Sequence, residues 1–443
     1  MKTHRTIQRA KTGVIWAAAL LVHPATANAT EDRQAQCGAF TVAVIPDTQN
    51  YVDYKHQKAA GFPIDSAELF YEQMRYVADH AQSVGGDIVF ATHLGDVWQH
   101  YSQWSDPAHT ARGFKAMPNA MSSEVAESPR EQTRTVEIPS AINGFELIAG
   151  RLPFSVVPGN HDFDALWTDP THPPRPEATG RLKTGIRHLG GLAGFQSAFS
   201  DQSVFFKSQP WYVDSHDGGA DSAQIFASGQ CRFLHIGLQY QAPDASLAWA
   251  TRVIHRFPNM PTIVTTHDYL DRDGARDDNS NPDNSILDFR DNNPQMIWDE
   301  FISRNDQIFL VLSGHIGGQG YSVDRNLFGH EVHQMMADYQ GRWQVAKDLG
   351  RKDSGATLGD GWMRLLTFRL DGDKPTVRVR TYSTHYKKFS IEMKDYAAWY
   401  KEHEGFADLP DAEYLRRDDF VIGLGDFHQR FDSTKRSDDD AAN

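Results

Sequence analysis

Residues 41–50 read Thr-Val-Ala-Val-Ile-Pro-Asp-Thr-Gln-Asn, and this stretch decides the fold. Its first five residues, apolar and mostly β-branched, run into a turn signal and therefore predict a buried strand. Asp47 and Gln49 follow at the strand end, two positions apart, so their side chains point the same way. Ligands of open α/β sheets bind at this carboxyl edge. The stretch predicts an α/β fold with oxygen ligands at the edge of a sheet.

The same pattern recurs four more times along the chain. Strand-like apolar runs cover 87–94, 153–157, 261–265 and 308–312, separated by helices or long polar excursions. These runs end in Gly95-Asp96, Gly159-Asn160-His161-Asp162, Thr266-His267 and Gly314-His315. Parallel strands would bring all of these ends to one edge, beside Asp47 and Gln49. Besides Asp162, these ends supply two carboxylates, two carboxamides and three imidazoles, without a thiolate, which are typical ligands of a divalent transition metal.

The composition is that of a soluble globular protein, with 40% hydrophobic and 11% aromatic residues among 443. Residues 1–29 are predicted to be a secretory signal peptide, because a basic segment precedes an apolar run at 13–22 and an Ala27-Asn28-Ala29 cleavage site. We therefore expect an exported protein, periplasmic or secreted. No later stretch approaches the ~20 apolar residues of a membrane-spanning helix, so no transmembrane segment is expected after signal cleavage.

Charge and cysteine content limit the partners and the compartment. Removal of the signal peptide would change the formal charge from −14 to −18. A chain this acidic repels polyanions, which argues against extended nucleic acid as a partner. Cys37 and Cys231 each precede a strand-like run, and export would permit a disulfide between them. Two buried free thiols remain the alternative, because the sequence does not fix the geometry.

The five ordered motifs resemble those of the calcineurin-like metallophosphoesterase superfamily, and Gly159-Asn160-His161-Asp162 is the most specific of them. The resemblance implies a four-layer αββα sandwich with two central mixed β-sheets, over a domain at 38–385. The second sheet is expected to use the antiparallel strands after residue 330. A C-terminal extension at 386–430 is expected to pack on this domain, and 431–443 to form a disordered tail.

The resemblance also implies a set of metal ligands. In the family, the aspartate at the position of Asp96 bridges two metals. Asn160, His267 and His315 match the remaining ligands of one of these metals, so this half of the site is complete. The expected cofactor is one or two divalent ions, with manganese, iron and zinc as the candidates.

The other half of the site departs from the family pattern. The family holds its second metal through an Asp-x-His motif and a final histidine, and these positions are Asp47, Gln49 and Gly317 in this chain. Glutamine is a neutral and weaker ligand than histidine, and glycine supplies no ligand at all. The second metal is therefore expected to bind more weakly, unless His330 or His333 replaces the missing imidazole.

The implied reaction is hydrolysis of a phosphate ester by metal-activated water. His161 matches the family's non-ligand histidine and would act as general acid, and Asp162 is expected to orient its imidazole. The first expectation is a phosphomonoesterase or protein phosphatase that acts on a phosphorylated small molecule or protein. The alternatives are a phosphodiesterase for nucleotides or lipid headgroups and a non-catalytic metal-binding protein, the latter motivated by Gln49 and Gly317. Oligomeric state cannot be read from the sequence.

Overall fold

The computed structural model describes residues 37–104, 106–107, 111, 129–169, 186–276, 292–352 and 357–431. The predicted signal peptide at 1–29, and the predicted tail apart from Phe431, lie outside these residues. Within the described ranges, no helix combines the length and apolar character needed to cross a membrane.

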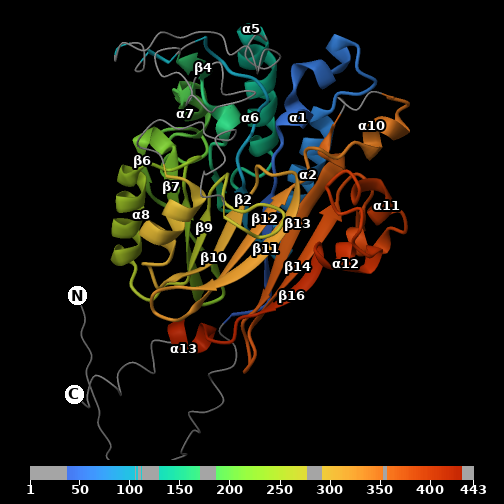
Figure 1. Cartoon of the computed structure of the whole chain (residues 1–443). Coiled ribbons are helices and arrows are strands. Elements are labelled where there is room, and N and C mark those ends of the chain that lie inside the picture. The colour runs from blue at the N-terminus through green and yellow to red at the C-terminus, as the bar shows by residue number, and fades with distance from the viewer. Residues whose placement is uncertain are drawn as a thin grey trace, which may run out of the picture. The chain divides into compact units, whose positions relative to one another are not determined.

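Two seven-stranded mixed sheets form the centre of the fold (Figure 1). The first has the order β15-β14-β13-β1-β2-β3, with β16 beside β14. Its strands are β1 (Phe40–Ile45), β2 (Ile88–His93), β3 (Phe154–Val156), β13 (Trp362–Arg369), β14 (Thr376–Ser383), β15 (Lys388–Phe389) and β16 (Asp419–Gly423). Strands β1, β2 and β3 are parallel, as predicted, so their carboxyl ends lie at one edge.

The second sheet has the order β11-β12-β10-β9-β8-β7-β6. Its strands are β6 (Tyr212–His216), β7 (Asp221–Ser228), β8 (Cys231–Gly237), β9 (Thr262–Thr265), β10 (Ile308–Ser313), β11 (Gly318–Arg325) and β12 (Glu331–Asp338). Strands β8, β9, β10 and β12 are parallel, so the motifs after β9 and β10 also share an edge. A separate hairpin pairs β4 (Ala165–Asp169) with β5 (Ile186–Gly190).

Helices cover the outer faces of both sheets. The described α-helices are α1 (Gln49–Val52), α2 (Ala67–Asp79), α5 (Arg130–Gln132), α6 (Ile138–Glu146), α7 (Ala193–Phe199), α8 (Asp244–Arg256), α9 (Pro294–Ile297), α10 (Gln344–Asp348), α11 (Tyr396–Tyr400), α12 (Asp411–Arg416) and α13 (Phe427–Phe431). Met74 of α2 and Phe145 of α6 pack on the first sheet, and Trp249 of α8 packs on the second. The result is a mixed α/β sandwich.

Alternation along β1 explains why the layers form. Val42 packs between the two sheets, whereas its neighbour Ala43 packs against the helices, as a period of two requires. Aromatic rings fill the space between the sheets, and the Phe40 ring lies 5.2 Å from that of Phe233 in β8. The apolar run that opens the domain is therefore buried on both faces.

The predicted content of the second sheet is right for one strand after residue 330 and wrong for two. Strand β12 joins that sheet, antiparallel to β11 and parallel to β10, whereas the hairpin of β13 and β14 extends the first sheet beside β1. Strand β13 suits this central place because Leu365 faces the helices while Leu366 faces the other sheet, so both faces are apolar. The C-terminal extension also contributes to the first sheet, since β16 pairs with β14.

A disulfide joins Cys37 to Cys231, with their Cα atoms 5.4 Å apart. This settles the alternative that the sequence left open, and it is compatible with an oxidising compartment. The bond links residues 194 positions apart and ties the start of β1 to β8 in the other sheet.

We expect reduction of this disulfide to destabilise the protein by about 2–4 kcal/mol, because the crosslink restricts the unfolded chain. Thermal unfolding with and without a thiol reductant measures the effect. In the double variant Cys37→Ser/Cys231→Ser, the reductant should have no effect. An unchanged unfolding temperature on reduction of the native protein would contradict this expectation.

Candidate metal centre

Six of the predicted site residues meet where strands of both sheets end. Asp47, Asp96 and Asn160 follow β1, β2 and β3 of the first sheet, and His267 and His315 follow β9 and β10 of the second. Gln49, two residues after Asp47, begins helix α1. The site is therefore assembled across the two sheets, which explains why its members are so far apart in the sequence.

Close backbone approach requires glycine at two of these strand ends. A Cβ atom on Gly159 would lie 2.2 Å from Asp96 Oδ1, and one on Gly95 would lie 2.6 Å from His267 Nδ1. Gly95 also has a φ of 101°, which disfavours other residues. The next residue, Asp96, has a φ of 53°, a left-handed conformation that aspartate and asparagine tolerate better than most residues.

Four predicted ligands surround one point. The ligand atoms of Asp96, His267 and His315 all lie within 4.8 Å of one another. His267 Nε2 lies 3.3 Å from Asp96 Oδ1, 3.1 Å from Asn160 Oδ1 and 3.1 Å from His315 Nδ1. The other ring nitrogen, Nδ1, donates to the carbonyl of Leu94 at 2.8 Å, which leaves Nε2 as the ligand atom. Two imidazoles, a carboxylate and an amide oxygen can hold a divalent transition metal.

Asp47 and Gln49 complete the group. The Asp47 carboxylate accepts from the amide of His315, with Oδ2 at 3.2 Å, and Gln49 Nε2 donates to Asp96 Oδ2 at 3.0 Å. Gln49 is fully buried, and its Oε1 has no hydrogen-bond partner among the described residues. A buried acceptor without a partner is costly, by about 1–3 kcal/mol. A cation beside Asp47 and Asp96 would satisfy this oxygen.

Buried negative charge also favours a cation. Burial raises the pKa of Asp47 well above its usual range, and the nearby carboxylate of Asp338 adds to this effect. Burial likewise raises the pKa of Asp338 to about 6. Burial alone would lower the pKa of His267, but the carboxylates of Asp96 and Asp47 raise it to about 10. The buried carboxylates of Asp47, Asp96 and Asp338 thus outnumber the buried positive charges beside them. A divalent ion would offset this excess of negative charge.

Sequence reasoning missed Asp338. It is the last residue of β12, next to β10 in the second sheet, so it lies at a strand end as Asp47 and Asp96 do. Its place at a strand end is the signal that could have identified it, but the prediction of antiparallel strands after residue 330 included no site residue.

His161 lies at the same strand end but is oriented differently from the prediction. Its Nδ1 donates to the backbone carbonyl of Gln99 at 2.6 Å, and its amide donates to Asp96 Oδ1 at 2.9 Å. Asp162 instead accepts from the backbone amides of Val97 and Gly159, at 2.9 and 2.8 Å. The expected contact between Asp162 and the imidazole is wrong, because Asp162 fixes the two loops that carry the site.

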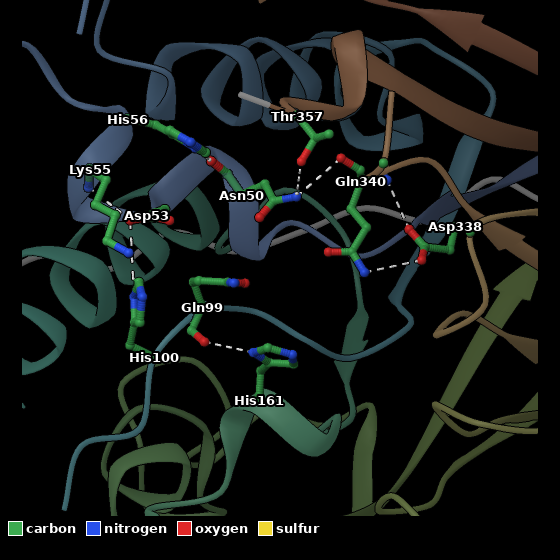
Figure 2. A pocket seen from close by; sticks show the side chains of 12 residues that line it. Asn50, Asp53, Lys55, His56, Gln99, His100, His161, Asp338, Gln340 and Thr357 are labelled. Atoms are coloured by element: carbon green, nitrogen blue, oxygen red, sulfur yellow. Dashed lines mark hydrogen bonds and ion pairs between the residues drawn. The ribbon is translucent and has the colours of Figure 1, made fainter. Parts of the chain in front are cut away.

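A polar cavity of about 460 Å³ opens beside His161 (Figure 2). Its walls include Asn50, His100, Gly317, Asp338 and Gln340. Its size suits a small molecule or the tip of a larger one.

A second buried group of possible ligands adjoins this cavity, formed by Asp53, His100 and Glu137. Its members already have hydrogen-bond partners: His100 Nδ1 lies 2.6 Å from Glu137 Oε1, and Asp53 Oδ1 accepts from the amide of Lys55 at 2.8 Å. This group therefore does not require a metal to hold it together.

The predicted replacement of the missing ligand by His330 or His333 is wrong. Both lie near the start of β12, whereas Asp338 at its other end lines the cavity. His330 Nδ1 lies 2.6 Å from Asp306, and His333 Nδ1 lies 2.9 Å from the Tyr321 hydroxyl.

No protein-family model matches the sequence. The chain is similar to the uncharacterized protein YvnB of Bacillus subtilis (strain 168), with 25% identity over 355 residues. The match covers 79% of this chain and 20% of YvnB, so the chain spans about a fifth of that relative's length. Because YvnB is itself uncharacterized, the similarity assigns no activity to this protein.

Proposed function

We propose that this protein is a metal-dependent phosphoric ester hydrolase with the calcineurin-like metallophosphoesterase fold. The observation that carries the proposal is the convergence of Asp96, His267 and His315 across two sheets, their ligand atoms within 4.8 Å of one another. The partnerless Oε1 of Gln49 and the cavity beside His161 support it further. Export is part of the proposal and is supported by the disulfide.

The residues divide between two metal positions. Asp96, Asn160, His267 and His315 would hold the first ion, and Asp47, Gln49 and Asp96 would hold a second, weaker one. Such ions supply Lewis acidity and a water nucleophile at neutral pH. With its oxygen ligands and no imidazole, the second position favours harder ions such as Mn²⁺ or Mg²⁺.

His161 is the proposed general acid. Because a carbonyl only accepts hydrogen bonds, the contact with Gln99 fixes one proton on Nδ1, so the second proton of the imidazolium lies on Nε2, from which it would pass to the leaving oxygen of the substrate. The backbone amide of His161 donates to Asp96, one of the proposed metal ligands. This contact holds the proposed general acid at a constant distance from the proposed metal site. Asp162 holds the loop of Gly159 and so positions His161 indirectly.

The test combines metal analysis with hydrolysis of two chromogenic esters, 4-nitrophenyl phosphate and bis(4-nitrophenyl) phosphate. Each is assayed with Mn²⁺, Fe²⁺, Zn²⁺, Mg²⁺ and no added metal. We expect turnover that depends on metal, and the preferred ester distinguishes a monoesterase or protein phosphatase from a diesterase. One tightly bound metal without turnover of either ester would instead favour a non-catalytic metal-binding protein.

Restoring the missing imidazole should strengthen the second metal position. A Cβ atom on Gly317 would meet only Arg272 Nη2, at an ordinary 3.6 Å, so the backbone at residue 317 can accept a side chain. We expect the second metal equivalent to bind roughly tenfold more tightly. Changes of this size in metal affinity follow when residues around a metal site are substituted. Titration with Mn²⁺ measures this, with Gly317→Leu as the control that adds bulk without a ligand. Equal binding by both variants would place residue 317 away from the metal.

A further inference from the structure

A second cavity, of about 310 Å³, lies beside β11 and the C-terminal extension. Its wall includes Arg272, Gln319, Tyr321, Arg416, Arg417 and Phe420, none of which lines the cavity at His161. Arg272 connects the two places, because its Nε donates to the carbonyl of Gly317. Nothing in the proposed hydrolysis uses this second cavity.

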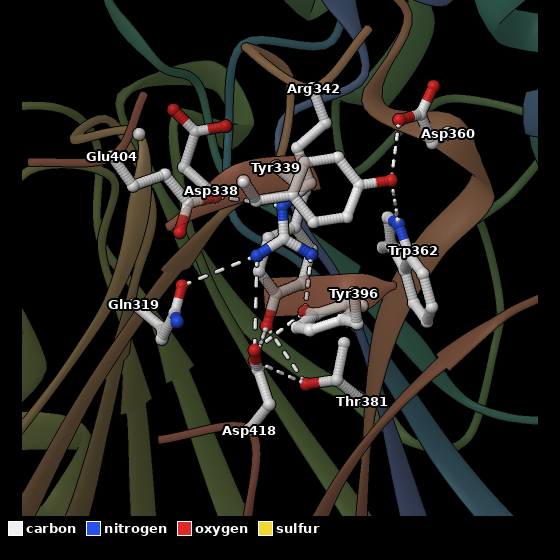
Figure 3. Close-up of polar contacts among 12 residues, drawn as sticks. Gln319, Asp338, Tyr339, Arg342, Asp360, Trp362, Thr381, Tyr396, Glu404 and Asp418 are labelled. Carbon is white, nitrogen blue, oxygen red and sulfur yellow. Dashed lines mark hydrogen bonds and ion pairs between the residues drawn. The ribbon is translucent and has the colours of Figure 1, made fainter. Parts of the chain in front are cut away.

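Two buried hydrogen-bond donors in its wall lack acceptors. Gln319 is fully buried, and its Oε1 accepts from Arg342 Nη2 at 3.4 Å, which fixes the amide orientation (Figure 3). Its Nε2 then has no partner among the described residues, and the same holds for Nε of Arg417. Arg417 is held in place by its Nη2, which donates to the carbonyls of Arg272 and Gln319. These unpaired donors belong to residues that line the cavity, and they add positive potential to its wall.

The charge of the wall favours an anion as the ligand of this cavity. Three guanidinium groups, those of Arg272, Arg416 and Arg417, face two carboxylates, those of Asp273 and Glu413. This positive excess occurs in a chain whose net charge is −14. Arg416 is exposed and makes no ion pair within the described part of the chain, so its guanidinium is available to a ligand.

Aromatic side chains line the same cavity. The Tyr321 and Phe420 rings lie 5.2 Å apart, and Tyr321 is 38% exposed despite its size. An aromatic wall beside guanidinium and amide donors suits a ligand with one apolar and one anionic end. We propose that this cavity binds a small organic oxyanion, a carboxylate or phosphate carried on an aromatic or apolar group.

The test uses metal-free protein, so that the proposed hydrolytic centre takes no part, and isothermal titration at constant ionic strength. Four probes form two pairs, each with one anion that carries a ring and one that does not. The phosphate pair is phenyl phosphate and inorganic phosphate, and the carboxylate pair is benzoate and acetate. We expect saturable binding of phenyl phosphate or benzoate, with at least ~10-fold weaker binding of the matching anion that lacks the ring. The preferred pair distinguishes a phosphate from a carboxylate ligand.

The variant Arg416→Ala should weaken this binding by about tenfold, the effect of losing one charge-assisted hydrogen bond. Arg369→Ala, which removes another exposed arginine outside the cavity, should bind as the native protein does. Because Arg416 is exposed, its loss does not endanger folding. Absence of binding for all four probes, or equal binding by native protein and Arg416→Ala, would overturn the proposal.

Discussion

Replacing Asp96 with asparagine is expected to reduce metal-dependent hydrolysis by ~100-fold or more, because even groups that only contact metal ligands cost 10–100-fold when removed. Asp96 lies within reach of both proposed metal positions, and its Oδ1 also accepts the amide of His161. The substitution removes the negative charge and keeps the shape. It should also keep the fold, since asparagine tolerates the left-handed backbone that residue 96 adopts.

Metal content and turnover are measured on the same preparation, and thermal unfolding verifies that the variant is folded. Asp371→Asn provides a matched control, because Asp371 is exposed in the turn between β13 and β14. We expect the control to retain both metal and activity. Full activity of Asp96→Asn would contradict the proposed centre, whereas loss of metal with the fold intact would support it.

Local pattern predicted the parts of the fold that depend on neighbouring residues. The buried strand at 41–45 could be found in a short window of sequence. The pairing of Thr41 with Thr367 could not, because strands this far apart leave no local trace of which sheet they join. The error in the second sheet has this cause.

The site, too, has features that local sequence predicts and features that it does not. Its candidate ligands could be predicted because each is a side chain of a type that binds metals and follows a strand. The partner of His161 could not, since it is a backbone carbonyl, that of Gln99, and every residue carries one. The sequence offered Asp162 as the natural partner, yet in three dimensions that carboxylate is taken by backbone amides.

A buried arginine joins the C-terminal extension to the site. Arg342 is 1% exposed and donates to Glu404 at 2.9 Å and to the Tyr396 hydroxyl at 2.6 Å (Figure 3). Its guanidinium lies 4.0 Å from the centre of the Tyr339 ring, and Asp418 lies 3.9 Å from its Nη2. The loop that carries it begins directly after β12, so the extension fixes the segment that places Asp338 and Gln340 in the cavity wall.

Replacing Arg342 with methionine is expected to destabilise the protein by about 3–5 kcal/mol, because it leaves Glu404 buried without its cation. Denaturant unfolding measures this loss, and Arg369→Met at an exposed position is the control. The double variant Arg342→Met/Glu404→Gln should recover part of the stability, since it also removes the stranded charge. If the double variant were no more stable than Arg342→Met, lost packing among the aromatic rings, and not the unpaired carboxylate, would account for the destabilisation.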